Sequence, residues 1–236
     1  MAAHSRIEWT QSTWNPVTGC SSISEGCHHC YARRMANRLQ GMGLSRYKDG
    51  FFVTIHRDLI TAPFHWKKPR LIFVNSMGDL FHEQVPFSFI KEVFSTIEST
   101  PRHTFQLLTK RADRLVKLAD KLPWPYNLWV GVTVELQQYI DRIEKLKQVP
   151  AAVRFVSFEP LLGPVESLRL ENINWAIVGG ESGPHARPME ATWARSIRDT
   201  CLDSSIPFFF KQWGGDNKKK RKRCLDRKLW NQYPNR

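Results

Sequence analysis

Long apolar runs are missing from this sequence. No stretch approaches the roughly 18 apolar residues of a membrane-spanning helix, and residues 1–14 lack the apolar segment of a secretory signal. We therefore expect a soluble, cytoplasmic protein without a membrane partner. Because the cytoplasm is reducing, the clustered cysteines among the five in the chain are expected to be metal ligands or catalytic groups rather than disulfides.

Two common functional motifs and an interdomain linker are also absent. The chain contains neither G-x-x-x-x-G-K-[ST] nor G-x-S-x-G, which excludes a phosphate-binding P-loop and the nucleophile elbow of α/β hydrolases. No stretch rich in Gly, Ser or Pro separates two halves. With 236 residues, the chain is long enough for one sizeable core and short for two. We predict a single domain over 1–236, with an N-terminal loop at 19–31 and a basic C-terminal segment at 214–236.

Acidic residues are scarce relative to basic ones. The chain has 22 Asp and Glu against 35 Lys and Arg, which gives a net charge of +13. Six positive charges lie in a row in "KKKRKR" at 218–223, for which a solvated loop is the alternative interpretation. Because Lys and Arg bind phosphates irrespective of base sequence, the charge favours DNA, RNA or a nucleotide as a partner.

Short apolar runs recur from residue 71 onward, and polar turns and amphipathic segments separate them. The runs are continuous rather than alternating, as in strands that are buried on both faces. Parallel strands with helical crossovers imply an α/β fold, either a barrel or an open sheet. The predicted strands are 71–75, 104–108, 128–132, 153–157, 175–179 and 207–211, and the predicted helices between them are 87–100, 136–148 and 191–203.

The first 70 residues fit this pattern less well. Residues 12–19 predict a short first strand, and 30–40 predict a helix with Tyr31, Met35 and Leu39 on one stripe. Residues 50–60 predict a further strand.

Charged side chains follow the ends of the predicted strands. In barrels and doubly wound α/β folds, ligands bind at this carboxyl-end rim. For any single residue, a helix cap or a solvated turn is the alternative. A rim that carries both signs of charge suits a zwitterionic or polyfunctional ligand. The residues are Asp79, Lys110, Arg111, Glu135, Glu159, Glu181 and Lys211.

Three cysteines, Cys20, Cys27 and Cys30, lie close together in the predicted loop, with the spacing C-x6-C-x2-C. A structural zinc site normally has four ligands, and His28 or His29 would have to be the fourth. Three thiolates instead match a [4Fe–4S] cluster that leaves its fourth iron open for a small molecule. Zinc remains the alternative.

Long blocks of this sequence resemble a phage-associated family of radical-SAM-like three-cysteine proteins, where SAM is S-adenosylmethionine. The blocks include "IEWTQSTWNPVTGCSSISEGCHHCYA", "IFVNSMGDLFHEQVP", "WAIVGGESGPHARPM" and "LDRKLWNQYP", so the resemblance covers essentially the whole chain. It implies a cluster and a partial or complete (β/α) barrel with mainly parallel strands. The usual radical SAM spacing is C-x3-C-x2-C, and the first interval here is three residues longer. The chain is also distantly similar to the spore photoproduct lyase group, which repairs DNA with a SAM-derived radical.

The resemblance implies cofactor-binding roles. Cys20, Cys27 and Cys30 would hold the cluster. "SMGD", comprising Ser76, Met77, Gly78 and Asp79, occupies the position of the Gly-Gly-Glu turn of radical SAM enzymes, so Asp79 would hold the SAM amino group.

The other rim residues receive roles from the same resemblance. Lys110 or Arg111 would pair with the SAM carboxylate, and Glu135 would accept hydrogen bonds from the ribose hydroxyls. The residues left for the substrate are Glu159, Glu181, His185, Arg187, Lys211 and Trp213, of which Glu159, Glu181 and Lys211 are the predicted catalytic residues.

Together these observations predict an iron–sulfur enzyme of radical SAM type. It would bind SAM at the open iron, receive electrons from a reductant protein, and modify or repair a nucleic acid or nucleotide. A further partner protein is left open. The alternatives are a nucleic-acid-binding protein with a structural cluster or zinc, and a zinc-dependent hydrolase. The acidic rim argues against a pure polyanion binder.

Overall fold

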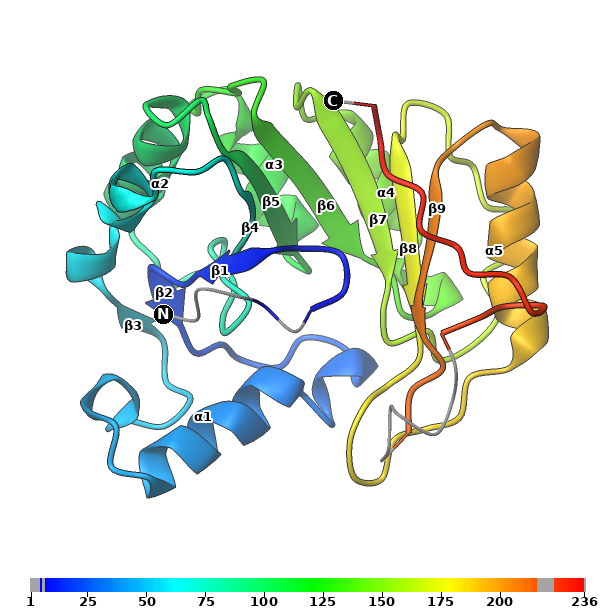
Figure 1. The fold of residues 1–236 in the computed structure, drawn as a ribbon, viewed down its shortest axis with the longest axis horizontal. Coiled ribbons are helices and arrows are strands. Elements are labelled where there is room, and N and C mark those ends of the chain that lie inside the picture. Colours follow the sequence, from blue (N-terminus) through cyan, green and yellow to red (C-terminus); the bar gives the residue numbers. More distant parts are fainter. Residues whose placement is uncertain (1–4, 6, 216–222, 236) are drawn as a thin grey trace.

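The computed structural model describes residues 5, 7–215 and 223–235. Its centre is a seven-stranded sheet, open between β1 and β9, in which every neighbouring pair of strands is parallel (Figure 1). The predicted α/β fold with mainly parallel strands in a partial barrel is confirmed. In sheet order the strands are β1 Ser12–Trp14, β4 Leu71–Val74, β5 Thr104–Thr109, β6 Leu128–Thr133, β7 Val153–Phe158, β8 Trp175–Gly179 and β9 Phe208–Gln212.

Of the five α-helices in the described residues, four connect successive parallel strands. In α2, Phe89, Ile90, Val93 and Ile97 are buried on one face, as the apolar spacing predicts. The helices are α1 Tyr31–Gly41, α2 Phe87–Glu98, α3 Ala112–Ala119, α4 Asp141–Lys147 and α5 Ala191–Asp203. Short 3-10 helices span Glu25–Cys27, Ser45–Tyr47, Arg57–Leu59, Ala62–His65 and Gln137–Tyr139.

Both faces of the sheet are covered by apolar side chains. The outer core packs one face against α2–α5. The inner core fills the opposite face and contains no helix residue; its largest members are Trp9, Trp129, Phe155, Trp175 and Phe209. Burial on both faces explains why the strands are continuous apolar runs.

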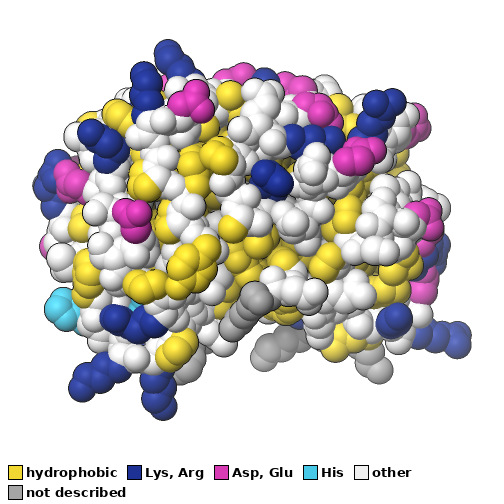
Figure 2. Space-filling model, turned by 90° about the horizontal axis from the view of Figure 1, so that it is seen from above, with side chains coloured by type: hydrophobic (Ala, Val, Ile, Leu, Met, Phe, Trp, Pro, Cys, Tyr) yellow, Lys and Arg dark blue, Asp and Glu magenta, His cyan; other side chains and the backbone are white. Residues whose placement is uncertain are grey.

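The inner core closes the amino end of the sheet. Figure 2, seen from above, looks toward the amino ends of the strands; many hydrophobic side chains lie over the middle of this face beside a Lys or Arg side chain, and most of the charged side chains lie around its rim. The polar side chains that follow the strands are therefore at the opposite, carboxyl end.

The first 70 residues differ in part from the prediction. Within 50–60, only β3 (Thr54–Ile55) is a strand, and it pairs antiparallel with β2 (Val17–Thr18) outside the main sheet. Only Ala36 of α1 is buried, and Tyr31 is half exposed. The expected apolar stripe does not form a core face, because α1 lies beyond the carboxyl ends of the strands and covers no face of the sheet (Figure 1).

The C-terminal residues cover the edge of the sheet at β9. Asn231 forms an antiparallel bridge with Phe209, and the Phe210 amide donates to the Trp230 carbonyl at 3.1 Å. This pairing satisfies backbone groups that an edge strand would otherwise expose. Of the predicted basic segment, residues 216–222 lie outside the described residues. Among the residues that the structure does describe, no helix is both long and apolar enough to span a membrane.

Candidate functional site

Residues 19–31, which we call the cysteine loop, begin against the end of β4. The Gly19 amide donates to the Met77 carbonyl at 2.8 Å, and Gly19 forms a parallel bridge with Gly78. Gly19 has a φ of +82°, and a Cβ there would lie 2.1 Å from the Phe52 carbonyl oxygen. Only glycine combines this conformation with so close an approach.

The loop then contacts the ends of three further strands. The hydroxyl of Ser21 accepts from Arg111 Nη2 at 2.9 Å, just after β5. The hydroxyl of Ser24 donates to Glu135, after β6. His29 Nδ1 lies 2.9 Å from a carboxylate oxygen of Glu181, after β8. The polar rim predicted from the sequence thus holds the cysteine loop across the mouth of the partial barrel.

Glu135 is the most deeply buried carboxylate of the site, with no exposed surface. It accepts hydrogen bonds from Ser24, from Lys110 Nζ and, at 2.8 Å, from Arg142 Nη1. Two cations and a hydroxyl therefore satisfy a charge that would otherwise be very costly to bury. The loop packs directly on this group, since a Cβ at Gly26 would lie 2.6 Å from Glu135 Oε1.

Asp79 connects the ends of β4 and β5. Thr109 Oγ1 donates to its two oxygens at 2.8 and 2.9 Å, and the amides of Phe81 and Lys110 donate at 2.9 and 3.2 Å. Burial raises the pKa of this carboxyl, and the hydrogen bonds from Thr109 counteract the rise. Both oxygens are already engaged, so the predicted contact with a SAM amino group stays a prediction.

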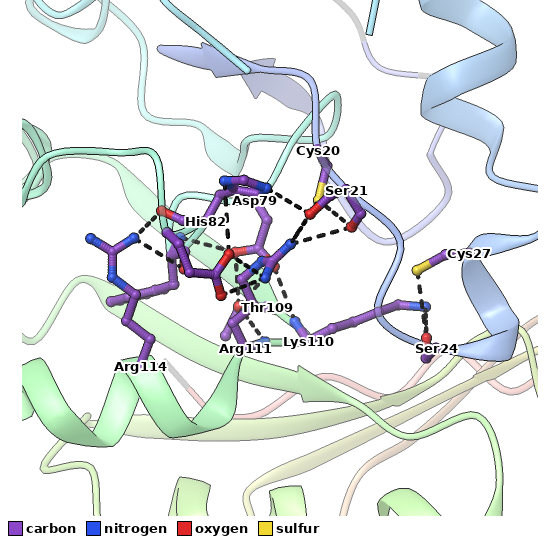
Figure 3. A network of polar contacts seen from close by, with 12 residues as sticks. Cys20, Ser21, Ser24, Cys27, Asp79, His82, Thr109, Lys110, Arg111 and Arg114 are labelled. Carbon is purple, nitrogen blue, oxygen red and sulfur yellow. Dashed lines mark hydrogen bonds and ion pairs between the residues drawn. The ribbon is translucent and has the colours of Figure 1, made fainter. Parts of the chain in front are cut away.

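Arg111 joins this network to the first cysteine. Its guanidinium contacts Glu83 at 2.6 and 2.5 Å, the Ser21 carbonyl at 3.2 Å and the Cys20 sulfur at 3.8 Å. Figure 3 shows Asp79 and Arg111 beside Cys20, and Lys110 extending toward Ser24 and Cys27. The cations predicted at the end of β5 therefore lie next to two of the three cysteines.

The three cysteines are free thiols of intermediate exposure. Burial raises the pKa of Cys27, but the charge of Lys110 and hydrogen bonds from Ile23 and Ser24 outweigh it and lower that pKa overall. Burial, and then the charge of Asp79, raise the pKa of Cys20 to about 11. Cys30 immediately precedes α1.

A cavity of about 220 Å³ lies between the loop and the sheet. Its lining includes Cys30, Ser76, Lys110, Glu159 and Glu181. It is thus bounded by one cysteine and by charged groups from β5, β7 and β8. This is where the loop, the turn after β4 and the polar rim meet.

The thiols fit a [4Fe–4S] cluster in chemistry and in number. Cys201 is buried in α5, where burial raises its pKa to about 12, and Cys224 lies outside the loop. The ligand geometry is not preformed, because within residues 5, 7–215 and 223–235 no three His, Cys, Asp or Glu side chains are grouped closely enough for a metal ion.

Two further ion pairs complete the rim. Lys211 Nζ, in β9, lies 2.5 Å from Glu159 Oε1, after β7. Arg187 contacts Glu181 through Nη2 at 2.5 Å and Nε at 3.0 Å. Burial alone would raise the pKa of Glu181, but hydrogen bonds from Arg187 and His29 lower it to about 2.

The sequence did not identify several partners of these groups. Ser24, Glu83 and Arg142 each bind a predicted site residue. Arg142 follows Glu135 by seven residues, across a 3-10 turn and into α4, a spacing that could have suggested contact. The pairing of Ser24 with Glu135 spans 111 residues and has no local sequence signal.

In the predicted turn at 76–79, the Ser76 hydroxyl and the Met77 amide donate to the side-chain oxygen of Asn15 at 3.2 and 3.1 Å.

Replacing Glu181 with glutamine tests its ion pair through pH dependence. The folded-state pKa is lowered from 4.5 to about 2, so the pair stabilises the fold above pH 4.5, and this contribution is lost as pH falls toward 2. We expect Glu181→Gln to reduce the free energy of unfolding at neutral pH by roughly 1.5–3 kcal/mol. Urea unfolding of both proteins should show this difference shrinking below pH 4.5. A difference that does not change with pH would contradict the assignment.

Comparisons with known proteins place the chain as follows. A family model described as "Protein of unknown function (DUF5131)" matches residues 4–234. No curated protein matches. A solved structure of spore photoproduct lyase complexed with dinucleoside spore photoproduct is similar at 12% identity and a TM-score of 0.45, covering 78% of this chain and 58% of that one. A double mutant of spore photoproduct lyase with bound AdoMet and dinucleoside spore photoproduct is similar at 11% identity and a TM-score of 0.46, covering 79% and 59%. The chain thus spans less than two thirds of the length of either structure.

Proposed function

The chain belongs to the family of proteins of unknown function DUF5131, and we propose that it is an iron–sulfur enzyme of radical SAM type that acts on a nucleic acid or nucleotide. The observation that carries this proposal is the cysteine loop. Three thiols and no fourth lie in a loop that polar contacts hold against the ends of β4, β5, β6 and β8. In barrels of parallel strands, ligands bind and react at the carboxyl ends of the strands, which is where this loop lies.

In this proposal Cys20, Cys27 and Cys30 hold a [4Fe–4S] cluster and leave one iron open. Such a cluster would supply one-electron chemistry for the reductive cleavage of SAM, with the electron drawn from a separate reductant protein. The lowered pKa of Cys27 favours the thiolate that a cluster requires.

Lys110 is the residue best placed to bind the SAM carboxylate. Its ammonium lies between the cysteine loop and Glu135, and it lines the cavity that Cys30 also lines. Arg111 is held by Glu83 and Ser21, so it positions the loop around Cys20. Glu135 already accepts hydrogen bonds from three donors. Its proposed contact with the ribose hydroxyls therefore requires the hydrogen bond from Ser24 or from Lys110 to break.

The cofactor and the substrate would share the rest of the rim. Ser76, Met77, Gly78 and Asp79 form the turn that we propose contacts the SAM amino group. Glu159, Lys211 and Glu181 face the mouth from β7, β9 and β8 and are the proposed substrate-side groups. The pair of Glu159 with Lys211 can hold or move a proton between the carboxylate and the ammonium.

The test is the EPR spectrum of anaerobically reconstituted, dithionite-reduced protein, recorded with and without SAM. A reduced [4Fe–4S] signal that shifts on addition of SAM would support the proposal. A cluster signal that does not change when SAM is added would indicate a structural cluster. Zinc without iron in the purified protein would favour a zinc site. Either of these results would overturn the radical SAM proposal.

A further inference from the structure

A second and larger cavity, of about 850 Å³, lies beside the cysteine loop between α3 and α4. We call it the α3–α4 cleft. Ile23 of the loop lines it, together with Lys110 and Arg111 from the end of β5. The cleft therefore adjoins the candidate site and shares lining residues with it, including Lys110 and Arg111, while most of its wall belongs to helices that the proposed chemistry does not use.

Positive charge dominates the lining of the α3–α4 cleft. Even when the buried Asp79 and Glu135 behind the lining are counted, the cations outnumber the carboxylates. The lining cations are Lys110, Arg111, Arg114, Lys117, Arg142 and Lys145, and the lining carboxylates are Glu83, Asp113 and Asp141.

Two of these cations form no direct ion pair with a carboxylate of the described residues. Arg114 donates to the backbone carbonyls of His82 and, at 2.6 Å, Val85, and burial lowers its pKa. Lys117 is exposed on α3, and neither residue forms an ion pair within the described part of the chain. An anion in the cleft could pair with both charges, and phosphate is an anion that Arg binds through two hydrogen bonds and Lys binds as a point charge.

Two of the three lining carboxylates, Asp113 and Asp141, share a single lysine, while Glu83 pairs with Arg111. Lys145 Nζ lies 2.7 Å from both Asp113 and Asp141, and so connects the starts of α3 and α4. Both carboxylates are exposed, at 84% and 59% of the side chain. As exposed lining residues they reduce the positive potential of the cleft, which makes them useful for a test.

An aromatic ring accompanies the cations. Tyr139 lines the cleft, and the guanidinium of Arg142 lies 4.1 Å from its ring centroid. Cations along a groove together with an aromatic ring are typical of sites for single-stranded nucleic acid, in which phosphates meet the charges and a base stacks on a ring. A duplex keeps its bases stacked internally and offers no base face to such a ring.

We infer that the α3–α4 cleft binds the phosphates of single-stranded nucleic acid beside the cysteine loop. The inference deepens the proposed function and rests on it for the role of the bound strand, since it names the substrate class of the neighbouring site. The binding itself requires neither cluster nor SAM, because every residue that carries it belongs to the protein.

The test is the affinity of the full chain for a fluorescent single-stranded thymidine oligonucleotide, measured by anisotropy over a range of salt concentrations. Lys117→Glu should weaken binding roughly three- to tenfold at low salt and reduce the slope of log affinity against log salt by about 1. Lys91→Glu, on the exposed face of α2 and outside the cleft, changes the net charge equally and should have little effect. Asp113→Asn should strengthen binding about two- to fivefold, a gain that misfolding cannot produce.

The outcomes separate this inference from the proposed function. Three results would each overturn the inference that the cleft binds single-stranded nucleic acid. They are equal effects of Lys117→Glu and Lys91→Glu, no gain in affinity with Asp113→Asn, and thymidine monophosphate binding as tightly as the oligonucleotide. Lys117→Glu should keep the iron content and the EPR signal of the parent protein, and Cys27→Ser should keep oligonucleotide binding. If the EPR test contradicted the cluster, the oligonucleotide-binding result would still stand. If the anisotropy test contradicted the cleft, the EPR result would still stand.

Discussion

Cys27→Ala is expected to lose essentially all iron and sulfide after anaerobic reconstitution, together with the brown colour of the protein. A cluster left with two protein thiolates has two open irons and is not retained. Cys27 is the informative choice because it is the loop cysteine whose pKa is lowered, by the charge of Lys110 and by hydrogen bonds from Ile23 and Ser24. Iron and sulfide assays, with the visible absorption spectrum, measure the outcome.

The matched controls are the two cysteines outside the loop. Cys201→Ala removes a thiol that is buried in α5 and whose pKa is raised to about 12, and Cys224→Ala removes the other. Both variants should keep the iron content of the parent protein. Loss of iron in Cys201→Ala, or its retention in Cys27→Ala, would show that the ligand set is wrong.

Glu135→Ala is expected to have the largest effect on stability of any substitution at the site. It leaves Lys110 and the buried Arg142 without the carboxylate that they share. Removing one partner from a buried ionic network costs about 3–5 kcal/mol, because the remaining charges stay buried and unpaired. Urea unfolding at neutral pH measures the loss.

Glu144→Ala is the control for that measurement. Glu144 lies 2.7 Å from Lys147, but 62% of its side chain is exposed. Exposed pairs contribute about 0–1 kcal/mol, so this variant should unfold at nearly the parental urea concentration. Similar losses in the two variants would mean that burial does not govern the contribution of Glu135.

The sheet could be predicted because burial on both faces leaves a strong local signal. Six of its strands are continuous apolar runs, and the structure has a strand at each of them. Helix α3 was missed because it is only eight residues long, which is too short a segment to show a clear helical period. The extent of β3 was overestimated because the apolar run that contains it packs beside β2, where only two residues pair.

The position of the candidate site could be predicted, but the hydrogen bonds and ion pairs between its residues could not. Parallel strands place their carboxyl ends at one edge, so the residues that follow them could be expected to gather there. Which of them pair depends on contacts between distant parts of the chain. Asp79 was expected to be open to a ligand, whereas Thr109 and two amides already bind it. Nothing in the sequence near residue 79 indicates that saturation.

The contacts of the cysteine loop also bear on the biosynthesis of the protein. His29 and its partner Glu181 are 152 residues apart in the chain. At ribosomal rates of 5–20 residues per second, roughly 8–30 s separate the emergence of the thiols from that of the last strand end that holds their loop. During that interval the three cysteines are exposed on a nascent chain with no barrel mouth to receive them. Metal loading that follows completion of the sheet would avoid capturing the thiols in a misplaced loop.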